Sequence, residues 1–428
     1  MNMSTKSQHL LLIAGIGGHT LEEAVPSLLS ITNRISILYI DIWKPSKDIQ
    51  KLWGSLHLDG ELIIANSQEE AIAEAYSLNI RIPIDGVITY SELLLKSQAL
   101  IIEHLNLPGT PYAAIEIAQS KILQRVLFEK VRVASPCFAI INKSSDIEDA
   151  VRKIGLPALF KPSQGMGSVG VYIVKNLEEV YKAFNKLSIS SSIFLETNKK
   201  ALLEEILPLE GNTNSLFANY VSVESLLVNG KYKHLVITDR ARLCHGYIEE
   251  GLIMPSHLPS SIQSLIIKEA EKAISAIGLT HGAVHTEIAI VGNKPMIIEV
   301  NARAGGPIPS MLLAASGYDY AIDIALSSLN IETDSIPHFS KIAWHRFIPI
   351  PQGEWKVISY TLTEKIMDEI SNIVYFSPRF LPGEIANKDR TLHLASFAVI
   401  AENIDDALKL VKETEDKFNI RLESINSF

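Results

Sequence analysis

Residues 295–306 read PMIIEVNARAGG, and this segment constrains the fold and chemistry of the chain more than any other. The apolar run at 296–298 is typical of a core strand. Because side chains on a strand alternate between its two faces, Glu299 and Asn301 point the same way, and Arg303 joins them if the chain stays extended. The end of this strand therefore carries two oxygen-donor side chains and a cation. Two glycines follow, which let another group approach the backbone closely.

The preceding segment, residues 281–290 (HGAVHTEIAI), indicates a β-hairpin with this strand. A three-residue turn at 292–294 would place Glu287 opposite Glu299. Two carboxylates so close repel each other unless a cation lies between them. With Asn301 they form an all-oxygen ligand set, which suits Mg²⁺ or Mn²⁺ held together with phosphates. The alternative is a set of exposed charges at the strand ends.

A glycine-rich stretch at residues 158–174 (ALFKPSQGMGSVGVYIV) predicts a strand, a loop and a second strand. Its lysine, Lys161, precedes the glycines, whereas in a Walker-type loop the lysine follows them and a helix begins. We call residues 163–170 the glycine flap. Its glycines and serines are Gly165, Gly167, Gly170, Ser163 and Ser168. Free backbone N–H groups in such a loop can surround phosphate oxygens, so the stretch predicts a phosphate-binding hairpin, with an ordinary hairpin turn as the alternative.

The first third of the chain alternates apolar runs (HLLLIAG, SILYI, ELIIA and GVITY) with helical patterns. This alternation indicates a parallel α/β sheet. Glycines follow the first strand, but Thr20 stands where the third glycine of a dinucleotide-binding fingerprint belongs. We therefore favour a tight strand-to-helix turn there, and a nicotinamide-dependent enzyme is the weaker alternative.

The whole chain is expected to be α/β, in four parts. Residues 1–115 form the N-terminal parallel α/β domain, and residues 116–188 a small subdomain with the glycine flap. Residues 189–320 form a larger subdomain with an antiparallel sheet. It includes the hairpin that carries Glu287, Glu299 and Asn301, which we call the metal hairpin. Residues 321–428 form a C-terminal α+β region.

Composition narrows the class of protein further. The net charge of −9, without blocks of Lys or Arg, argues against a nucleic-acid partner. The apolar run at residues 10–16 is too short to span a membrane and lacks a cleavage site. Only two cysteines occur, which suits a reducing compartment. We expect a cytoplasmic protein that acts on small molecules; the assembly state stays open, with a homodimer among the alternatives.

Four motifs in order, KPSQGMGSVG from Lys161, LEEIL from Leu203, HTE from His285 and IEVNARAGG from Ile298, resemble the ATP-grasp superfamily over about residues 110–320. Within it, the last two motifs, the EEG segment from Glu249 and HRFIPIP from His345 are most similar to the L-amino acid ligases, which make dipeptides.

The resemblance implies ATP and Mg²⁺ or Mn²⁺ as cofactors. The residues it assigns to ATP lie on a helix, in the glycine flap and on the strand that would line the adenine: Lys121, Lys161, Ser163, Gly167, Ser168, Glu204, Glu205, Ile206 and Leu207. Those it assigns to the metal are Glu287, Glu299 and Asn301. Arg303 would hold an acyl phosphate, helped by the backbone of Gly305 and Gly306. Glu250 is the candidate for the ammonium group of an amino-acid substrate, with a solvated turn carboxylate as the alternative.

Two further positions stay open. Many family members carry a glutamate near the ribose, and residues 219–224 (NYVSVE) do not identify it. His285 shares the face of Glu287, and we expect a structural, hydrogen-bonding histidine there.

The sequence thus predicts an ATP-dependent ligase that joins a carboxylate to an amine, with two amino acids as substrates. One alternative is another ATP-grasp enzyme, of the biotin-carboxylase or purine-pathway type. The other is an ATP-binding protein without turnover.

Overall fold

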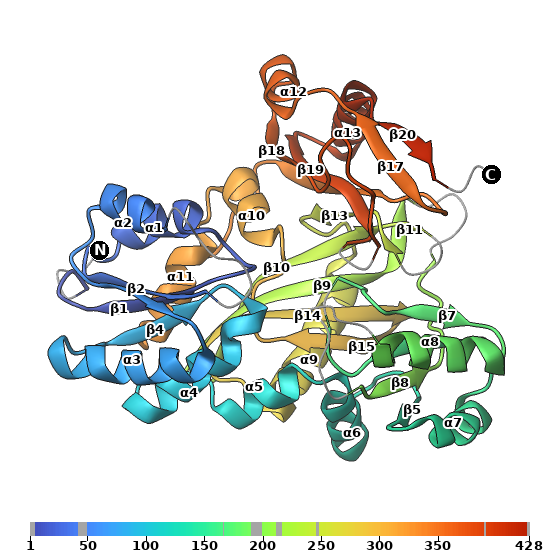
Figure 1. The fold of residues 1–428 in the computed structure, drawn as a ribbon, viewed down its shortest axis with the longest axis horizontal. Helices are drawn as coiled ribbons and strands as arrows, with labels where there is room; N and C mark the ends of the chain where they lie inside the picture. Colours follow the sequence, from blue (N-terminus) through green and yellow to red (C-terminus); the bar gives the residue numbers. More distant parts are fainter. Residues whose placement is uncertain are drawn as a thin grey trace.

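The computed structural model describes residues 5–41, 49–165, 167–189, 199–210, 216–244, 248–388 and 391–425. The elements form three large groups, and the third of these is a central antiparallel sheet (Figure 1). Within these residues, no helix has the length and apolar character needed to cross a membrane.

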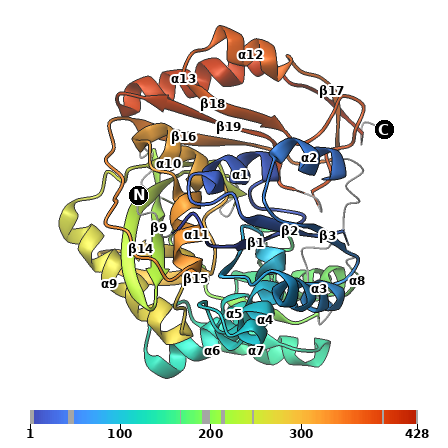
Figure 2. The ribbon, with the colours of Figure 1, turned by 90° about the vertical axis from the view of Figure 1, so that its left-hand side faces the viewer.

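The N-terminal group is a four-stranded parallel sheet in the order β3-β2-β1-β4, as predicted. Its elements are β1 (Leu10–Ala14), α1 (Leu21–Leu29), β2 (Ile35–Ile40), α2 (Ile49–Leu56), β3 (Leu62–Ala65), α3 (Gln68–Arg81), β4 (Gly86–Thr89), η1 (Glu92–Leu94) and α4 (Leu95–Leu105). Helices cover both faces of the sheet, α1 and α2 on one side and α3 and α4 on the other (Figure 2).

Thr20 caps the N-terminus of α1 through a capping box, which explains why a threonine and not a glycine stands at this turn. The Thr20 hydroxyl accepts a hydrogen bond from the Glu23 amide at 3.3 Å, and the Glu23 carboxylate accepts one from the Thr20 amide at 2.8 Å. A threonine here serves the start of the helix, in keeping with the strand-to-helix turn favoured from the sequence.

The second group is a four-stranded antiparallel sheet in the order β5-β8-β6-β7. The helices α5 (Tyr112–Ala118) and α6 (Lys121–Val131) precede it, and its elements are β5 (Phe138–Ile141), η2 (Ser144–Asp146), α7 (Ile147–Ile154), β6 (Ala158–Pro162), β7 (Tyr172–Val174), α8 (Leu177–Ile189) and β8 (Ala201–Glu204). Because β8 pairs with both β5 and β6, this sheet extends to Glu204. The small subdomain was expected to end at residue 188. That boundary is wrong, because it separates β8 from the sheet to which it belongs.

The third group is an eight-stranded sheet in the order β15-β14-β9-β10-β13-β16-β19-β18. Its strands are β9 (Phe217–Val228), β10 (Lys231–Ala241), β13 (Gly251–Met254), β14 (Gly282–Val291), β15 (Lys294–Asn301), β16 (Ile342–Pro349), β18 (Ile373–Pro378) and β19 (His393–Ala401). Three of them come from the C-terminal region, which continues the same sheet. Asn229 and Gly230 form the turn between β9 and β10, both at positive φ.

Helices cover this sheet and join it to the N-terminal group. They are α9 (Ser260–Ile277), α10 (Ile308–Ser316), α11 (Tyr320–Ser328), α12 (Thr363–Glu369) and α13 (Ile404–Phe418), and the remaining short strands pair as β11 (Leu243–Cys244) with β12 (Ile248–Glu249) and β17 (Trp355–Ser359) with β20 (Arg421–Ser424). The helix α9 ends at Gly278, which has a left-handed backbone conformation.

The alternation of strand side chains separates the core from the opposite face of the sheet. Ile288 on β14 and Val300 on β15 pack into the hydrophobic core beneath α9. Their neighbours Glu287, Glu299 and Asn301 therefore project from the other face. The sheet thus presents the predicted polar cluster away from its main core.

Candidate active site

Glu287 and Glu299 lie directly opposite each other in the β14–β15 hairpin, as predicted. The route to this register differs from the prediction, because the turn has two residues (292 and 293) between the strands, not three. A two-residue turn alone would pair Glu287 with Ile298. A β-bulge between Glu287 and Ile288 shifts the register by one residue and restores the pairing.

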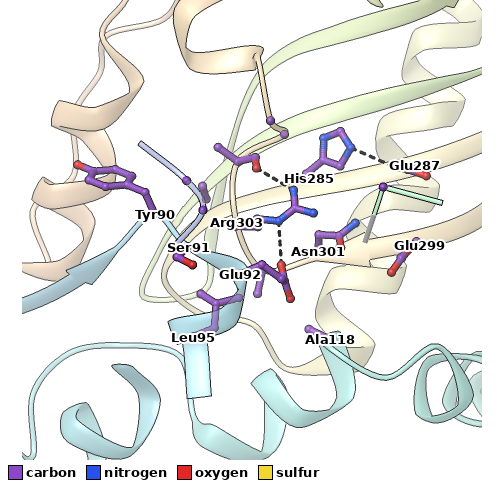
Figure 3. Close-up of a pocket in the computed structure, with 18 of the residues that line it drawn as sticks. Tyr90, Ser91, Glu92, Leu95, Ala118, His285, Glu287, Glu299, Asn301 and Arg303 are labelled. Carbon is purple, nitrogen blue, oxygen red and sulfur yellow. Dashed lines mark hydrogen bonds and ion pairs between the residues drawn. The ribbon is translucent and has the colours of Figure 1, made fainter. Parts of the chain in front are cut away.

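These carboxylates line a cavity of about 1470 Å³ between the three groups of elements. A site for one small ligand is typically about 300–1,000 Å³, so the cavity has room for more than one ligand. All the predicted site residues line it except Ser163 and Glu250. Figure 3 shows Glu287, Glu299, Asn301 and Arg303 around one end of the hairpin.

Lys121 and Lys161 approach the cavity from two elements of the small subdomain. The Lys121 ammonium donates hydrogen bonds to Glu299 at 2.8 Å and to the carbonyl of Gly165 at 3.0 Å. The Lys161 ammonium lies 2.8 Å from Glu204. Both cations are therefore held in position by carboxylates at the cavity wall.

Glu204 is the buried anchor of this arrangement. Its side chain is 1% exposed and lies between Lys161 and Arg125, which donates from Nε at 2.8 Å. Burial acts to raise the pKa of Glu204, but the charges of Arg125 and Lys161 outweigh it, so the pKa is lowered. Glu204 therefore fixes Lys161 rather than an adenine ring. The following residues Glu205, Ile206 and Leu207 also line the cavity, as expected.

The glycine flap is the loop of the β6–β7 hairpin. Gly165, Gly167 and Gly170 all have positive φ, of 146°, 63° and 77°. Residues other than glycine rarely adopt such backbone angles. Met166 lies outside the described residues. Ser168 and Gly167 line the cavity, whereas Ser163 is buried behind it, where its carbonyl accepts the Lys121 amide at 2.8 Å.

His285 lies beneath the two carboxylates, as the expected structural histidine. Its Nδ1 hydrogen-bonds to the fully buried Glu224, and its Nε2 lies 3.3 Å from Glu287. Burial acts to lower the pKa of His285, but Glu224 and Glu287 together raise it to about 9. Glu224 is the one glutamate in residues 219–224, the segment that was considered for a contact to the ribose of ATP. Here it supports His285 and accepts the Gly305 amide at 3.2 Å.

The carboxylate of Glu287 is held ionised by its surroundings. Burial acts to raise its pKa, but the hydrogen bond from His285 and the charges of Arg240 and Arg303 lower it to about 2. An ionised carboxylate is the form that binds a cation.

Arg240 and Glu249 belong to the site but were not predicted from the sequence. Arg240 is 2% exposed, donates to Glu249 at 2.7 Å and lies 3.3 Å from the His285 Nε2. Tyr220 also donates to Glu249, at 2.5 Å. Only the alternation of residues on β10 could have indicated that Arg240 faces the cavity.

Glu250 does not lie where the resemblance suggested. Its carboxylate pairs with Arg346 at 2.9 Å, and it is absent from the cavity wall. The neighbouring Glu249 lines the cavity instead. The prediction that Glu250 meets a substrate ammonium is therefore wrong in this structure, because adjacent residues of an extended segment face opposite ways.

Arg303 forms an ion pair with Glu92 of the N-terminal group, 2.8 Å from Nε (Figure 3). Its Nη1 donates to the Ala304 carbonyl at 3.0 Å. No local pattern in the sequence marks Glu92, which is distant in the chain. The pair places the guanidinium at the meeting point of the N-terminal group and the metal hairpin.

Gly305 and Gly306 differ in the space around them, which gives a matched test. A Cβ on Gly305 would lie 2.7 Å from the His285 Nδ1 and 2.7 Å from Ile308, whereas a Cβ on Gly306 meets nothing within 4 Å. We expect Gly305→Ala to lower the free energy of unfolding by about 1–3 kcal/mol, the usual cost of overpacking. We expect Gly306→Ala to leave it unchanged. Thermal denaturation of both variants checks this, and equal midpoints would contradict the packing described here.

The hairpin has the donor set that a hard divalent cation requires. Two carboxylates in register and the amide of Asn301 offer oxygen ligands on one face. Within the described residues, no group of three or more His, Cys, Asp or Glu side chains comes together as a metal site. The set therefore fits Mg²⁺ or Mn²⁺ that shares its remaining ligands with phosphates, and it is too small for a site made by protein alone.

Comparison with known proteins shows what this fold and site are similar to. Residues 154–310 match the family model of the ATP-grasp domain. The matched residues include Lys161 and the whole metal hairpin. The predicted resemblance is thereby confirmed.

The curated relatives include alanine–anticapsin ligases and carnosine synthases. The chain is 29% identical over 248 residues to alanine–anticapsin ligase of Bacillus subtilis, covering 56% of this chain and 52% of that one. It therefore spans about half the length of this curated relative.

The fold as a whole is similar to that of two solved structures. An L-amino acid ligase from Bacillus licheniformis superimposes with a TM-score of 0.76 at 18% identity, covering 98% of this chain and 100% of that chain. N5-carboxyaminoimidazole synthetase from Staphylococcus aureus, complexed with ADP, gives 0.71 at 15% identity, covering 98% and 99%. At these identities the likeness shows a shared fold.

Proposed function

We propose that this protein is an ATP-dependent ligase that joins the carboxylate of one amino acid to the amine of another. The observation that carries the proposal is the arrangement of Glu287 opposite Glu299, with Lys121, Lys161 and Arg303 around the same cavity. The alanine–anticapsin ligase relative supports the same class of reaction.

The residues of the chain then divide into three tasks. Lys161 and the glycine flap bind the phosphates of ATP, and the segment 205–207 borders the adenine. Glu287, Glu299 and Asn301 hold Mg²⁺, which when bound offsets the negative charge of the phosphates. Phosphoryl transfer depends mainly on such positioning and charge stabilisation.

The reaction proceeds in two balanced steps. A carboxylate oxygen of the first amino acid attacks the γ-phosphorus of ATP, and the bond to the ADP oxygen breaks. The amine of the second amino acid then attacks the carbonyl carbon of the acyl phosphate. The C–O bond breaks, phosphate leaves, and the amine gives up a proton. Splitting the condensation in this way lowers each barrier.

Arg303 is the residue placed to hold the transferred phosphoryl group. Its present partner is the carboxylate of Glu92. Lys121 is likewise paired, with Glu299. When ATP and Mg²⁺ bind, a phosphate replaces Glu299 at Lys121, and Mg²⁺ replaces Lys121 at Glu299. A phosphoryl group at Arg303 replaces Glu92, which keeps the hydrogen bond that its carboxylate accepts from Gln119. The Gly305 amide already donates to Glu224, so the following amide, that of Gly306, is the one that can support the same group.

The proposal is tested by measuring phosphate release from ATP and Mg²⁺, with the twenty amino acids offered singly and in pairs. Mass spectrometry then identifies the products. We expect release that depends on a pair and a product with the mass of the two acids less water. ATP binding without phosphate release for any pair would contradict the proposal and favour a protein without turnover. Release that depends strictly on bicarbonate would instead assign the chain to the carboxylating type of ATP-grasp enzyme.

A further inference from the structure

The cavity continues beyond Arg240 to a second polar region, at the C-terminal part of the large sheet. It is lined by His345 and Phe347 of β16, and by Tyr375, Ser377 and Arg379 at β18 and just after it. We call these five residues the distal subsite. None of them is among the residues proposed for ATP or Mg²⁺.

Arg379 is the distinctive member of the distal subsite. Its Nη2 donates to the Ser396 hydroxyl at 3.0 Å. Of the arginines that line the cavity, Arg240 pairs with Glu249 and Arg303 pairs with Glu92. Within the part of the chain that the structure describes, Arg379 has no carboxylate partner. An arginine of this kind has donors left over for an anion.

His345 provides a second, independent sign of a ligand. Its side chain is 1% exposed, and its Nδ1 has no hydrogen-bond partner among the residues that the structure describes. The ring is held in place by Phe347, at 4.2 Å between centroids, and by Tyr375 at 5.7 Å. Buried polar atoms without partners are rare and call for an explanation. A ligand atom that hydrogen-bonds to this nitrogen from the cavity would explain why it lacks a partner in the protein.

The charges around the distal subsite favour an anion. Burial lowers the pKa of His345, and the charges of Arg379, His393 and Arg240 lower it further, so the ring is neutral. Glu23 also lines the cavity and its negative charge acts on Tyr375, but its carboxylate is held at the start of α1, where it accepts the Thr20 amide at 2.8 Å. The region therefore combines a fixed guanidinium with a neutral ring nitrogen.

The distal subsite lies within reach of the proposed reaction centre. Arg240 pairs with Leu252 and Leu252 with His345 across neighbouring strands. Two strand spacings amount to about 10 Å between the backbones of Arg240 and His345. Arg240, Arg379 and His345 line the same cavity, and both guanidinium charges act to lower the pKa of His345.

We propose that the distal subsite binds the carboxylate of the amine-bearing substrate, with Arg379 as its main contact and His345 beside it. This inference rests on the proposed ligase function and specifies its second substrate as an amino acid. The carboxylate of the first substrate is consumed when the amide forms, and its ammonium group is repelled by Arg379. The second substrate keeps its carboxylate throughout. A bidentate guanidinium–carboxylate contact fixes both its position and its orientation.

The test compares an amino acid with its carboxamide as the second substrate, in the wild type and in Arg379→Gln. We expect Arg379→Gln to raise the KM of the acid by about 10–100-fold, the effect of removing one partner of a charge pair. The KM of the carboxamide, of ATP and of the first amino acid should stay the same. The exposed Arg81→Gln serves as the control and should change none of these values.

His345→Phe keeps an aromatic ring at this position but removes its ring nitrogens. We expect it to raise the KM of the acid in the same direction and by less. An equal effect of Arg379→Gln on the acid and the carboxamide would overturn the inference. So would an effect confined to first substrates with an acidic side chain, because the distal subsite would then serve the other substrate.

A direct binding measurement separates this inference from the ligase proposal. If no pair of amino acids supports phosphate release, calorimetry with a non-hydrolysable ATP analogue and Mg²⁺ still measures amino-acid binding. Binding of amino acids by the wild type that weakens in Arg379→Gln, with carboxamides unaffected, would support the distal subsite even though the proposed function fails. Equal binding by both proteins would overturn it.

Discussion

Glu299→Gln is expected to lower the rate of ATP-dependent turnover by on the order of 10³-fold, while the protein stays folded. The substitution keeps the shape of the side chain but removes the charge that faces Glu287 across the hairpin. It also removes the anionic partner of Lys121. Both the binding of Mg²⁺ and the position of a phosphate-binding lysine should therefore suffer. Steady-state kinetics at saturating ATP measures the effect, and the unfolding midpoint monitors the fold.

The matched control is Glu332→Gln. Glu332 forms an exposed ion pair with Lys231 and lies outside the cavity. The same chemical change there should leave turnover unaltered. If Glu299→Gln keeps turnover within about tenfold of the wild type, the hairpin is not the metal site.

Arg125→Leu is expected to destabilise the protein by about 3–5 kcal/mol, the cost of removing one partner of a buried ion pair. The guanidinium is 2% exposed and donates to Glu204 at 2.8 Å and to the Ile298 carbonyl at 2.6 Å. Arg125 thus connects β8 of the small sheet with β15 of the large sheet. Its loss leaves Glu204 with Lys161 as its one remaining cation in the described residues.

The exposed arginine Arg81 provides the comparison for this measurement. Its side chain is 48% exposed and pairs with Glu61 at 2.7 Å. Screening by water makes such pairs contribute little to stability, so Arg81→Leu should not change the unfolding midpoint. Thermal denaturation of both variants checks the difference. Equal midpoints for Arg125→Leu and the wild type would show that the buried pair does not join the two sheets.

Local patterns in the sequence were sufficient for the elements of the metal hairpin. Alternation along one strand identifies which of its side chains share a face, so Glu299 and Asn301 could be assigned together. The register depended on a bulge beside Glu287, and a bulge arises from how two strands pair. The predicted pairing was right, but the turn length on which it rested was not.

The parts of the site that were missed depend on contacts between distant segments. Glu92 meets Arg303 only because the N-terminal group packs against the large sheet. Arg240 and Arg379 face the cavity because of the strand order, which local patterns do not determine. The choice of Glu250 over Glu249 was wrong by one residue, and on extended chain one residue reverses the direction of a side chain.

The same reason explains the error at the small sheet. The sequence around β8 (Ala201–Glu204) has the apolar character of a core strand and carries no sign of which sheet it joins. Its pairing with β5 and β6 is settled by the packing of the small sheet as a whole. Glu204 is consequently buried beneath Lys161, and it supports the cavity wall from behind.

The central claim is that a carboxylate is activated by transfer of the γ-phosphoryl group of ATP. It is tested most directly by labelling both carboxylate oxygens of the first amino acid with ¹⁸O and locating the label after one round of synthesis. The account predicts one ¹⁸O atom in the released phosphate and one in the new amide, because the bridging oxygen of the acyl phosphate leaves with the phosphate. Label in AMP, or phosphate free of label while the amide forms, would contradict it.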